Sequence, residues 1–258
     1  MTTYPFTSAL VTGASSGIGA EMARVLGEAG VPTVLVARRR ERLSEIADRY
    51  DGFEVLEADL GSPAGQAAVG DRISSTAEPV DLVVNNAGFG TSGRFHELDV
   101  DRLAAEVELN VAALTRLSHA ALSAMVPRGR GFLLNVSSIA SFQSSPGLGV
   151  YAATKAYVTS LTEALHAEVK PAGVHVTALC PGLTRTEFQD HSNTTGLAAR
   201  IPGIAWTSVE QVASTGLADV AANRTLSVPG VLYKTTVTAS DIMPRSITRW
   251  ISGSITRQ

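Results

Sequence analysis

The chain has 258 residues, a length at which one α/β domain can bury a single large core. Hydrophobic residues make up 45% of it and charged residues 17%, which disfavours the disordered and fibrous classes. The formal net charge of −3, without a lysine- or arginine-rich stripe, gives no electrostatic support to a nucleic-acid partner.

The single cysteine, Cys180, rules out an internal disulfide framework and fits a reducing cytoplasm. No apolar run approaches the roughly 18 to 20 residues that span a bilayer. Met1 to Leu10 also lacks the basic and apolar pattern of a secretory signal. We therefore expect a cytoplasmic protein with no membrane span.

Short β-branched runs alternate with longer helical patterns along most of the chain. The expected strands cover residues 9–12, 33–37, 54–57, 81–85, 132–136 and 174–179. The expected helices lie near residues 18–29, 40–49, 63–77, 100–126, 151–170 and 207–222. The strands are apolar on both faces, which suits a parallel sheet covered by helices on each side. The sequence thus predicts an α/β fold, a doubly wound, Rossmann-type parallel β-sheet flanked by helices, as one domain over residues 1–258.

Glycine, proline and polar residues follow the expected strands. Right-handed crossovers bring the carboxyl ends of such strands to one edge of the sheet, where ligands bind. The residues found there are Gly13, Arg38, Asp59, Asn86, Ser138 and Pro181. This edge is therefore the predicted ligand site.

A glycine-rich loop, Thr12-Gly-Ala-Ser-Ser-Gly-Ile-Gly19, joins the first expected strand to the first helix. Glycines permit a tight turn and close approach of the backbone to a pyrophosphate, and the helix N-terminus offers free N–H groups to phosphates. Glycine-rich turns are common, but this position between a strand and a helix favours a dinucleotide.

The end of the second expected strand favours NADP(H) over NAD(H). An NAD site offers a carboxylate to the ribose 2′-hydroxyl at this point, whereas an arginine accommodates a 2′-phosphate. Here Arg38, Arg39 and Arg40 follow the strand, and no acid comes before Glu41. Arg38 can pair with the phosphate bidentately, while Arg40 is interpreted as part of a solvated face.

Tyr151 and Lys155 lie four residues apart at the start of a long helical pattern, so both side chains share one helix face. A free tyrosine has a pKa near 10 and is a poor acid–base group at neutral pH. A nearby ammonium favours the phenolate and lowers that pKa, so we expect the pair to act as a general acid–base.

The combined motifs resemble those of the short-chain dehydrogenase/reductase family, in its NADP-preferring branch of ordinary length. The residues that carry the resemblance, over residues 8 to about 190, are Thr12-Gly-x-x-x-Gly-x-Gly19, Asn85-Asn-Ala-Gly88, Asn110, Ser138, Tyr151-x-x-x-Lys155 and Pro181-Gly-x-x-x-Thr186. Each residue taken alone also has an ordinary structural interpretation, such as a strand end or a helix cap. Their joint order and spacing favour the family.

The resemblance implies a role for each matching residue. Tyr151 would be the acid–base, Ser138 would hydrogen-bond the substrate oxygen, and Lys155 would bind the nicotinamide ribose and lower the tyrosine pKa. Asn110 would hold a water that links Lys155 to solvent. The implied cofactor contacts are Gly13, Ser15, Ser16, Gly17, Ile18, Gly19, Arg38, Arg39, Asp59, Leu60, Asn86, Ala87, Gly88, Tyr151, Lys155, Pro181, Gly182, Thr184 and Thr186. The five histidines are scattered without ligand spacing, so no metal site is expected.

Three segments, 89–95, 139–150 and 183–206, are expected to set the substrate. They are apolar with few charges, which favours an apolar or amphipathic small molecule. Their large apolar residues are Phe89, Ile139, Phe142, Leu148, Leu183, Phe188, Ile201, Ile204 and Trp206. Residues 183–206 are interpreted as a substrate-side lid.

The C-terminal region departs from the family pattern. Residues 229–238 suit a strand, but residues 239–258 continue as an atypical extension with apolar residues at helical spacing. The extension could pack on its own subunit or a partner, form a flexible tail, or lie on a membrane surface. We expect a homodimer, built from the helices at 100–126 and 151–170, or a homotetramer.

Three functions fit these residues. The first is an oxidoreductase that moves hydride between NADP(H) and the carbonyl or secondary alcohol of an apolar small molecule. The second is reduction of a 3-ketoacyl thioester, which needs a basic patch near the pocket for the acyl carrier; the candidates are Arg94, Arg128, Arg130 and Arg185. The third is a catalytically dormant NADP(H)-binding or sensing protein, which the intact Ser138, Tyr151 and Lys155 set disfavours.

Overall fold

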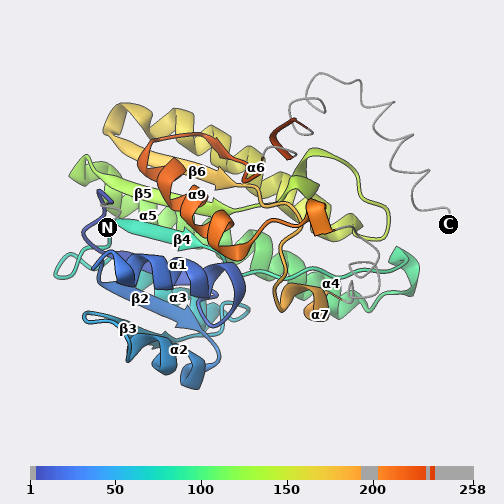
Figure 1. The fold of residues 1–258 in the computed structure, drawn as a ribbon, viewed down its shortest axis with the longest axis horizontal. Helices are drawn as coiled ribbons and strands as arrows, with labels where there is room; N and C mark the ends of the chain where they lie inside the picture. The colour runs from blue at the N-terminus through green and yellow to red at the C-terminus, as the bar shows by residue number, and fades with distance from the viewer. Residues whose placement is uncertain (1–3, 193–202, 231–232, 236–258) are drawn as a thin grey trace.

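The structure is a computed structural model, and it describes residues 4–192, 203–230 and 233–235. Seven parallel strands form one sheet in the order β3-β2-β1-β4-β5-β6-β7 (Figure 1). The strands are β1 (Ala9–Thr12), β2 (Thr33–Ala37), β3 (Glu54–Glu57), β4 (Leu82–Asn85), β5 (Gly131–Val136), β6 (Val174–Leu179) and β7 (Leu226–Ser227). The chain order reverses at β1, which pairs with both β2 and β4. Because the connections on either side of β1 run in opposite directions, a crevice forms at the carboxyl ends of the strands there.

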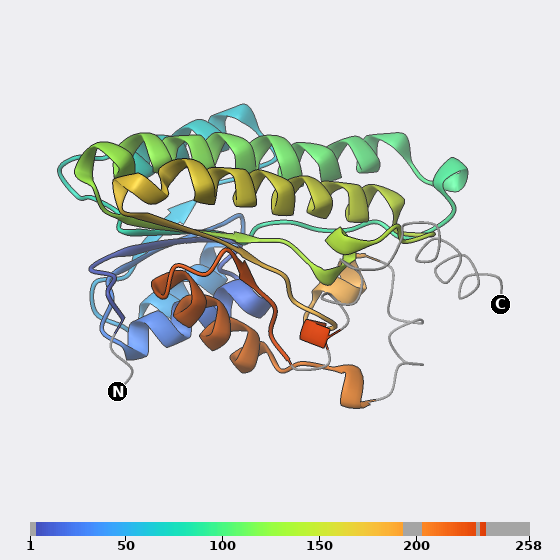
Figure 2. The same ribbon diagram turned by 90° about the horizontal axis from the view of Figure 1, so that it is seen from above.

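Helices cover both faces of the sheet (Figure 2). One face carries α1 (Gly17–Glu28), α2 (Arg40–Ala47) and α9 (Val209–Ala221). The other carries α3 (Pro63–Ile73), α5 (Leu114–Arg128) and α6 (Gly149–Val169). The remaining helical elements are η1 (Phe95–Glu97), α4 (Val100–Val107), η2 (Glu108–Ala113), η3 (Ile139–Phe142), η4 (Lys170–Ala172), α7 (Phe188–His191) and η5 (Gly203–Ala205). The predicted doubly wound α/β fold is confirmed.

The apolar character of the strands on both faces follows from this layering. Leu10 and Val11 are neighbours on β1 and are both fully buried, yet they belong to cores on opposite sides of the sheet. Successive side chains of a strand point to opposite faces, so a strand between two helical layers is apolar at every position. The edge strand β3 carries Glu54 and Glu57 because its outer side is open to solvent.

Two expected elements differ from the structure. The expected helix at 100–126 consists of α4, a π-helical segment over Glu108–Ala113, and α5. The wider turn places Asn110 inside this segment, and π-turns within helices are frequent at functional sites. The last strand is β7 at Leu226–Ser227, whereas residues 233–235, within the expected strand at 229–238, are helical. β7 pairs with β6 at two residue positions, and a strand of two residues has no recognisable pattern in the sequence.

Parts of two predicted segments lie outside the described residues. Of the lid at 183–206, residues 193–202 are not described, and the extension at 239–258 is not described at all. Among the described residues, no helix combines the length and apolar character needed to cross a bilayer. The dimer or tetramer stays a prediction.

Candidate active site

A cleft of about 860 Å³ runs along the carboxyl ends of the strands. Its wall is built by the loops after β1, β2, β3, β4, β5 and β6, by the start of α6, and by residues of the segment after β6 up to Gln189 together with Trp206. Every predicted cofactor and catalytic residue lines it except Gly19 and Asn110, which lie directly behind the wall. The strand ends therefore meet in one continuous site.

The glycine loop and the loop after β4 are held together by hydrogen bonds. The Thr12 hydroxyl accepts the backbone N–H groups of Asn86 and Ala87, at 2.9 and 3.0 Å, and the Asn86 amide donates to the Thr12 carbonyl at 2.9 Å. Gly13 has φ of +66°, and a Cβ there would stand 2.8 Å from the Asn86 amide nitrogen. Only glycine satisfies both conditions, so this turn keeps its backbone bare toward the cleft.

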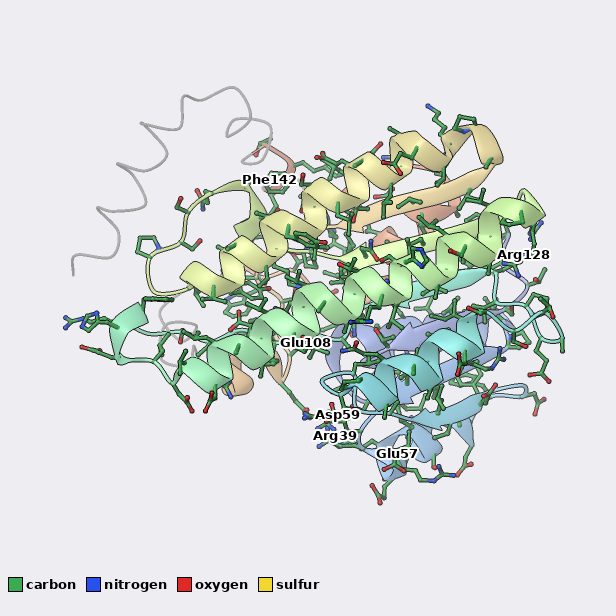
Figure 3. The ribbon with its side chains drawn as sticks, turned by 180° about the vertical axis from the view of Figure 1, so that it is seen from behind. Arg39, Glu57, Asp59, Glu108, Arg128 and Phe142 are labelled. Carbon is green, nitrogen blue, oxygen red and sulfur yellow. The ribbon has the colours of Figure 1, made fainter. Side chains whose placement is uncertain are left out.

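One end of the cleft, called here the arginine end, is formed by Arg38, Arg39 and Glu187. Arg38 is exposed on the cleft wall. Arg39 donates to the Ser15 hydroxyl at 2.9 Å and to the Ser16 hydroxyl at 3.0 Å, which ties the end of β2 to the glycine loop. Asp59, labelled in Figure 3, also lines the cleft, and its carboxylate accepts the Gly61 N–H at 3.0 Å. Leu60, the next residue, also lines the cleft.

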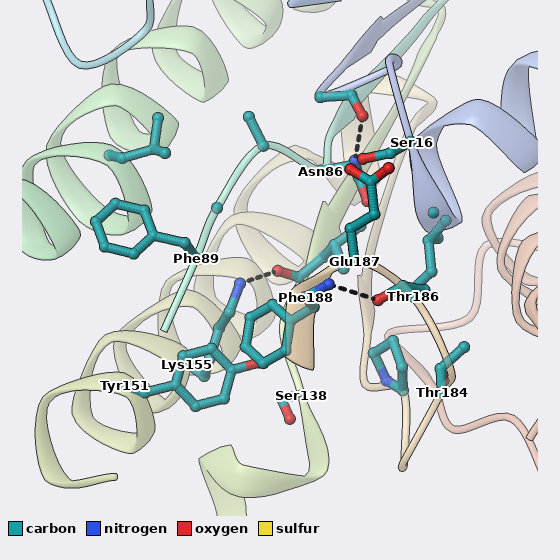
Figure 4. A pocket seen from close by; sticks show the side chains of 18 of the residues that line it. Ser16, Asn86, Phe89, Ser138, Tyr151, Lys155, Thr184, Thr186, Glu187 and Phe188 are labelled. Atoms are coloured by element: carbon teal, nitrogen blue, oxygen red, sulfur yellow. Dashed lines mark hydrogen bonds between the residues drawn. The ribbon is translucent and has the colours of Figure 1, made fainter. Parts of the chain in front are cut away.

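The other end, called here the catalytic end, is formed by Ser138, Tyr151 and Lys155 (Figure 4). Tyr151 and Lys155 stand in the first two turns of α6, and Ser138 follows β5. The Lys155 ammonium donates to the Val136 carbonyl at 2.8 Å and lies 5.8 Å from the centre of the Tyr151 ring. The α6 register and the adjacent strand end thus bring the three predicted catalytic side chains together.

Asn110 fastens the π-helical segment to the loop after β4. Its amide donates to the Phe89 carbonyl at 2.8 Å and to the Thr154 hydroxyl at 3.1 Å, and its oxygen accepts the Phe89 N–H at 3.1 Å. The Thr154 hydroxyl in turn donates to the Tyr151 carbonyl at 2.8 Å. Asn110 is therefore connected to the first turn of α6, where Tyr151 lies.

Burial dominates the proton affinities at the catalytic end. It raises the pKa of Tyr151 to about 12, although the Ser138 hydroxyl acts in the opposite direction. Burial also lowers the pKa of Lys155 to about 8, because the ammonium loses hydration. Burial is the largest influence on the phenol, and Lys155 is not among the groups that shift it; the expected lowering of the Tyr151 pKa by Lys155 stays a prediction. Tyr151 is consequently a neutral phenol at pH 7.

The wall beside the catalytic end is largely apolar. The expected residues that line it are Phe89, Ile139, Leu148, Leu183, Phe188 and Trp206. The Phe188 ring lies 5.3 Å from the Tyr151 ring, measured between centres. Phe142 does not line the cleft; it packs against the core around Cys180 and Val228. Ile201 and the Ile204 side chain lie outside what the structure describes.

Two acids near the site were missed by sequence reasoning. Glu187 binds Arg39 and Arg42, and the only sequence signal was its place one residue after the expected Thr186. Glu106 is fully buried, and its carboxylate influences the proton affinities of both Tyr151 and Lys155. It lies four residues before Asn110, and helical spacing places both on one face; that spacing could have identified it.

The comparisons with known proteins agree with this geometry. The profile of the family described as short chain dehydrogenase matches residues 7–196. An uncharacterized oxidoreductase of Staphylococcus saprophyticus is 34% identical over 183 residues, which cover 69% of this chain and 78% of that protein. The chain belongs to the short-chain dehydrogenase/reductase family. It is accordingly an NAD(P)-dependent oxidoreductase.

Solved structures of the same family superpose on nearly the whole chain. A short-chain dehydrogenase from Sphingobium yanoikuyae in complex with NADPH has a TM-score of 0.83 and 32% identity, covering 97% of this chain and 96% of that one. The bulky-bulky ketone specific alcohol dehydrogenase from Comamonas testosteroni has a TM-score of 0.78 and 29% identity, with 92% of each chain covered. In the described part of this short-chain dehydrogenase, no three His, Cys, Asp or Glu side chains gather as metal ligands.

Proposed function

We propose that this short-chain dehydrogenase/reductase is an NADPH-dependent reductase of apolar ketones or aldehydes, which also oxidises the corresponding secondary or primary alcohols. The observation that carries the proposal is the convergence of Ser138, Tyr151 and Lys155 at one end of a cleft whose other end holds the glycine loop, Arg38 and Arg39. The proposed proton donor, Tyr151, and the glycine loop proposed to bind the dinucleotide therefore line the same cleft.

The residues present fit a dinucleotide. Gly13 and Gly17, at φ of +66° and +56°, keep the turn before α1 free of side chains, and α1 begins at Gly17 without a side-chain cap or an acid in its first turn. Unpaired N–H groups at a helix start attract phosphates. The cleft volume of about 860 Å³ lies in the upper part of the roughly 300–1,000 Å³ range of ligand pockets, which leaves room for a cofactor and a small substrate. When bound, the dinucleotide supplies or accepts a hydride at its nicotinamide ring.

The chain's own residues handle the proton and the oxygen. Because burial keeps Tyr151 protonated at neutral pH, its hydroxyl can donate a proton to a carbonyl oxygen that becomes an alkoxide. The Ser138 hydroxyl is a second donor toward the same oxygen, and fixed donors stabilise developing negative charge. Lys155, anchored on the Val136 carbonyl, keeps a positive charge behind the phenol below about pH 8.

Asn110 is proposed to hold the water that connects Lys155 to solvent. Its side-chain oxygen accepts one hydrogen bond, from Phe89, and an amide oxygen can accept two. A Cβ placed on Gly88 would come within 2.8 Å of that oxygen and 3.6 Å of the Lys155 nitrogen, so bare backbone separates the two groups. This narrow space suits a water better than a side chain.

The preference for NADP(H) rests on charge at the arginine end. Ala37 ends β2 without the acid that an NAD site would present to the ribose, and three arginines follow. The similar dehydrogenase from Sphingobium yanoikuyae was solved with NADPH. An arginine fork matches a phosphate in geometry as well as charge.

The substrate class rests on the apolar wall beside Tyr151. Aromatic and aliphatic side chains from three separate segments line it, and burying them against a sugar phosphate would leave polar groups without partners. The similar enzyme from Comamonas testosteroni is described as specific for bulky-bulky ketones. An apolar ketone is therefore the first substrate to try.

The thioester alternative loses support from the placement of its candidate arginines. Arg128 and Arg130 precede β5 and bind the Val80 carbonyl and Asp81, at the amino ends of the strands and away from the cleft (Figure 3). Arg94 pairs with Glu97 on η1, and only Arg185 touches a cleft residue, stacking on Trp206. These four do not form one basic patch.

The test is a panel of apolar ketones, aldehydes and acyl thioesters, followed by loss of NADPH absorbance. We expect turnover on apolar ketones, with NADPH used at least about tenfold more efficiently than NADH. Equal efficiency with both cofactors would remove the NADP preference, and turnover confined to acyl thioesters would favour the second function.

A further inference from the structure

Glu187 connects the lid to the segment that follows β2. One of its carboxylate oxygens accepts a hydrogen bond from Arg39 at 2.9 Å, and the other accepts one from Arg42. The two arginines hold the pKa of this carboxyl down to about 2, so it is charged at every physiological pH. The contact joins residues 148 positions apart, and neighbouring lid residues Thr186 and Phe188 line the cleft.

The Glu187 carboxylate takes up one hydrogen-bond donor of the Arg39 guanidinium. Its three nitrogens are all in use: two contact the hydroxyls of Ser15 and Ser16, and the third donates to Glu187. The serines belong to the glycine loop, so Arg39 sits where the loop, the end of β2 and the lid converge. Glu187 itself lines the cleft and is visible above Phe188 in Figure 4.

A phosphate that binds the Nη1 edge of Arg39 has to replace the Glu187 carboxylate, because Glu187 already accepts the hydrogen bond from that nitrogen. A phosphate dianion and a carboxylate repel each other, and both compete for one guanidinium edge. A ribose hydroxyl carries no charge and gains nothing by displacing the acid. The two nicotinamide cofactors differ only in this group.

We propose that Glu187 is a cofactor-discriminating residue of the lid: its carboxylate holds Arg39 and is displaced from it only by a ligand with a phosphate at the adenosine ribose 2′ position. The inference rests on the proposed NADP(H) preference. It adds that part of the phosphate's binding energy is spent in breaking the contact between Glu187 and Arg39. It also adds that the lid residues around Glu187 separate from Arg39 with NADP(H) but stay attached with NAD(H).

The test uses two nucleotides that lack the nicotinamide and so cannot report on the catalytic end. Titration calorimetry of the full chain with 2′,5′-ADP and with 5′-AMP isolates the effect of the 2′-phosphate. For Glu187→Gln we expect binding of 2′,5′-ADP to tighten by about three- to tenfold and binding of 5′-AMP to change by less than about twofold. The matched control is Glu41→Gln, an exposed acid next to Arg42 that pairs with no residue among those described.

Hydrogen exchange of the backbone supplies a second readout. In the unmodified chain, 2′,5′-ADP should increase exchange in residues 184–192, and 5′-AMP should not. In Glu187→Gln the exchange should be high without a ligand, and 2′,5′-ADP should raise it no further.

Four results would overturn the inference: unchanged or weaker binding of 2′,5′-ADP by Glu187→Gln, equal tightening for both nucleotides, equal tightening by Glu41→Gln, or no nucleotide-dependent exchange in residues 184–192. The proposed function fails in a different way. If the unmodified chain binds 5′-AMP as tightly as 2′,5′-ADP, both the NADP preference and this inference fall. A clear preference for 2′,5′-ADP with an unchanged Glu187→Gln variant removes this inference alone.

Discussion

The catalytic end and the arginine end of the cleft place cations in opposite surroundings. Lys155 is 5% exposed, and burial lowers its pKa to about 8. Arg39, with a side chain 38% exposed, pairs with Glu187, whose pKa falls to about 2. Loss of water therefore brings the pKa of Lys155 close to neutral pH at the end proposed to transfer a proton. At the end proposed to bind a charged ligand, solvent and ion pairs keep Arg39 and Glu187 charged.

Removing the phenol should break the catalytic end and leave the arginine end intact. We expect Tyr151→Phe to lower kcat by about a thousandfold, because the proton donor is lost, while NADPH affinity changes by less than about twofold. Loss of NADPH absorbance and titration calorimetry measure the two quantities. The control is Tyr157→Phe, on the same helix but exposed and bonded to Thr115. Near-normal turnover of Tyr151→Phe on any substrate would contradict the assignment.

Reversing a charge should break the arginine end and leave the chemistry intact. We expect Arg38→Asp to weaken NADPH binding by about 10- to 100-fold, the value of one or two charge-assisted hydrogen bonds, and to leave NADH binding nearly unchanged. Calorimetry at low and high salt should show the largest difference at low salt. The matched control is Arg40→Asp, which makes the same change of charge at an arginine that lies 4.0 Å from Glu57. A loss of the same size in that control would point to general electrostatics.

The pH dependence should show which buried group limits reduction. Lys155 loses its proton as pH rises through about 8, whereas Tyr151 keeps its proton up to about 12. We expect kcat/KM for reduction to fall about tenfold per pH unit above about pH 8, where Lys155 loses its proton. A profile flat to pH 10 would show that the charge of Lys155 is not needed.

Neutralising Glu106 should produce the smallest change, in stability. Burial raises the pKa of this fully buried carboxyl, although Thr91, Arg102 and Lys155 act in the opposite direction. An acid with a raised pKa binds its proton more tightly when folded. Stability is therefore full below the unfolded pKa and is lost as pH rises through the folded pKa.

We accordingly expect Glu106→Gln to stabilise the chain by about 1 kcal/mol at pH 8 and by nothing measurable at pH 4. Urea denaturation at both pH values measures it. Glu168→Gln, an exposed acid on α6, should change neither value. A gain of equal size at both pH values would show that ionisation of Glu106 is not the cause.

Much of the fold was predictable, because its signals are local. Alternating apolar runs and helical patterns located β1, β2, β3 and β6 at their observed bounds. The crossover rule then placed the strand ends on one edge, and so located the cleft. β7 was not predicted, because two residues are too few to show a repeating pattern. The π-helical segment around Asn110 was not predicted either, because a single wide turn hardly alters helical spacing.

Taken by itself, the sequence determined the layered sheet, the bare glycine turn, and the placement of Tyr151 and Lys155 on one helix face, since each depends on residues close together in the chain. Only the tertiary structure decided the direction of the Tyr151 pKa, because desolvation depends on which distant segments cover the hydroxyl. It also decided the pairing of Glu187 with Arg39, which no local pattern can encode across 148 positions.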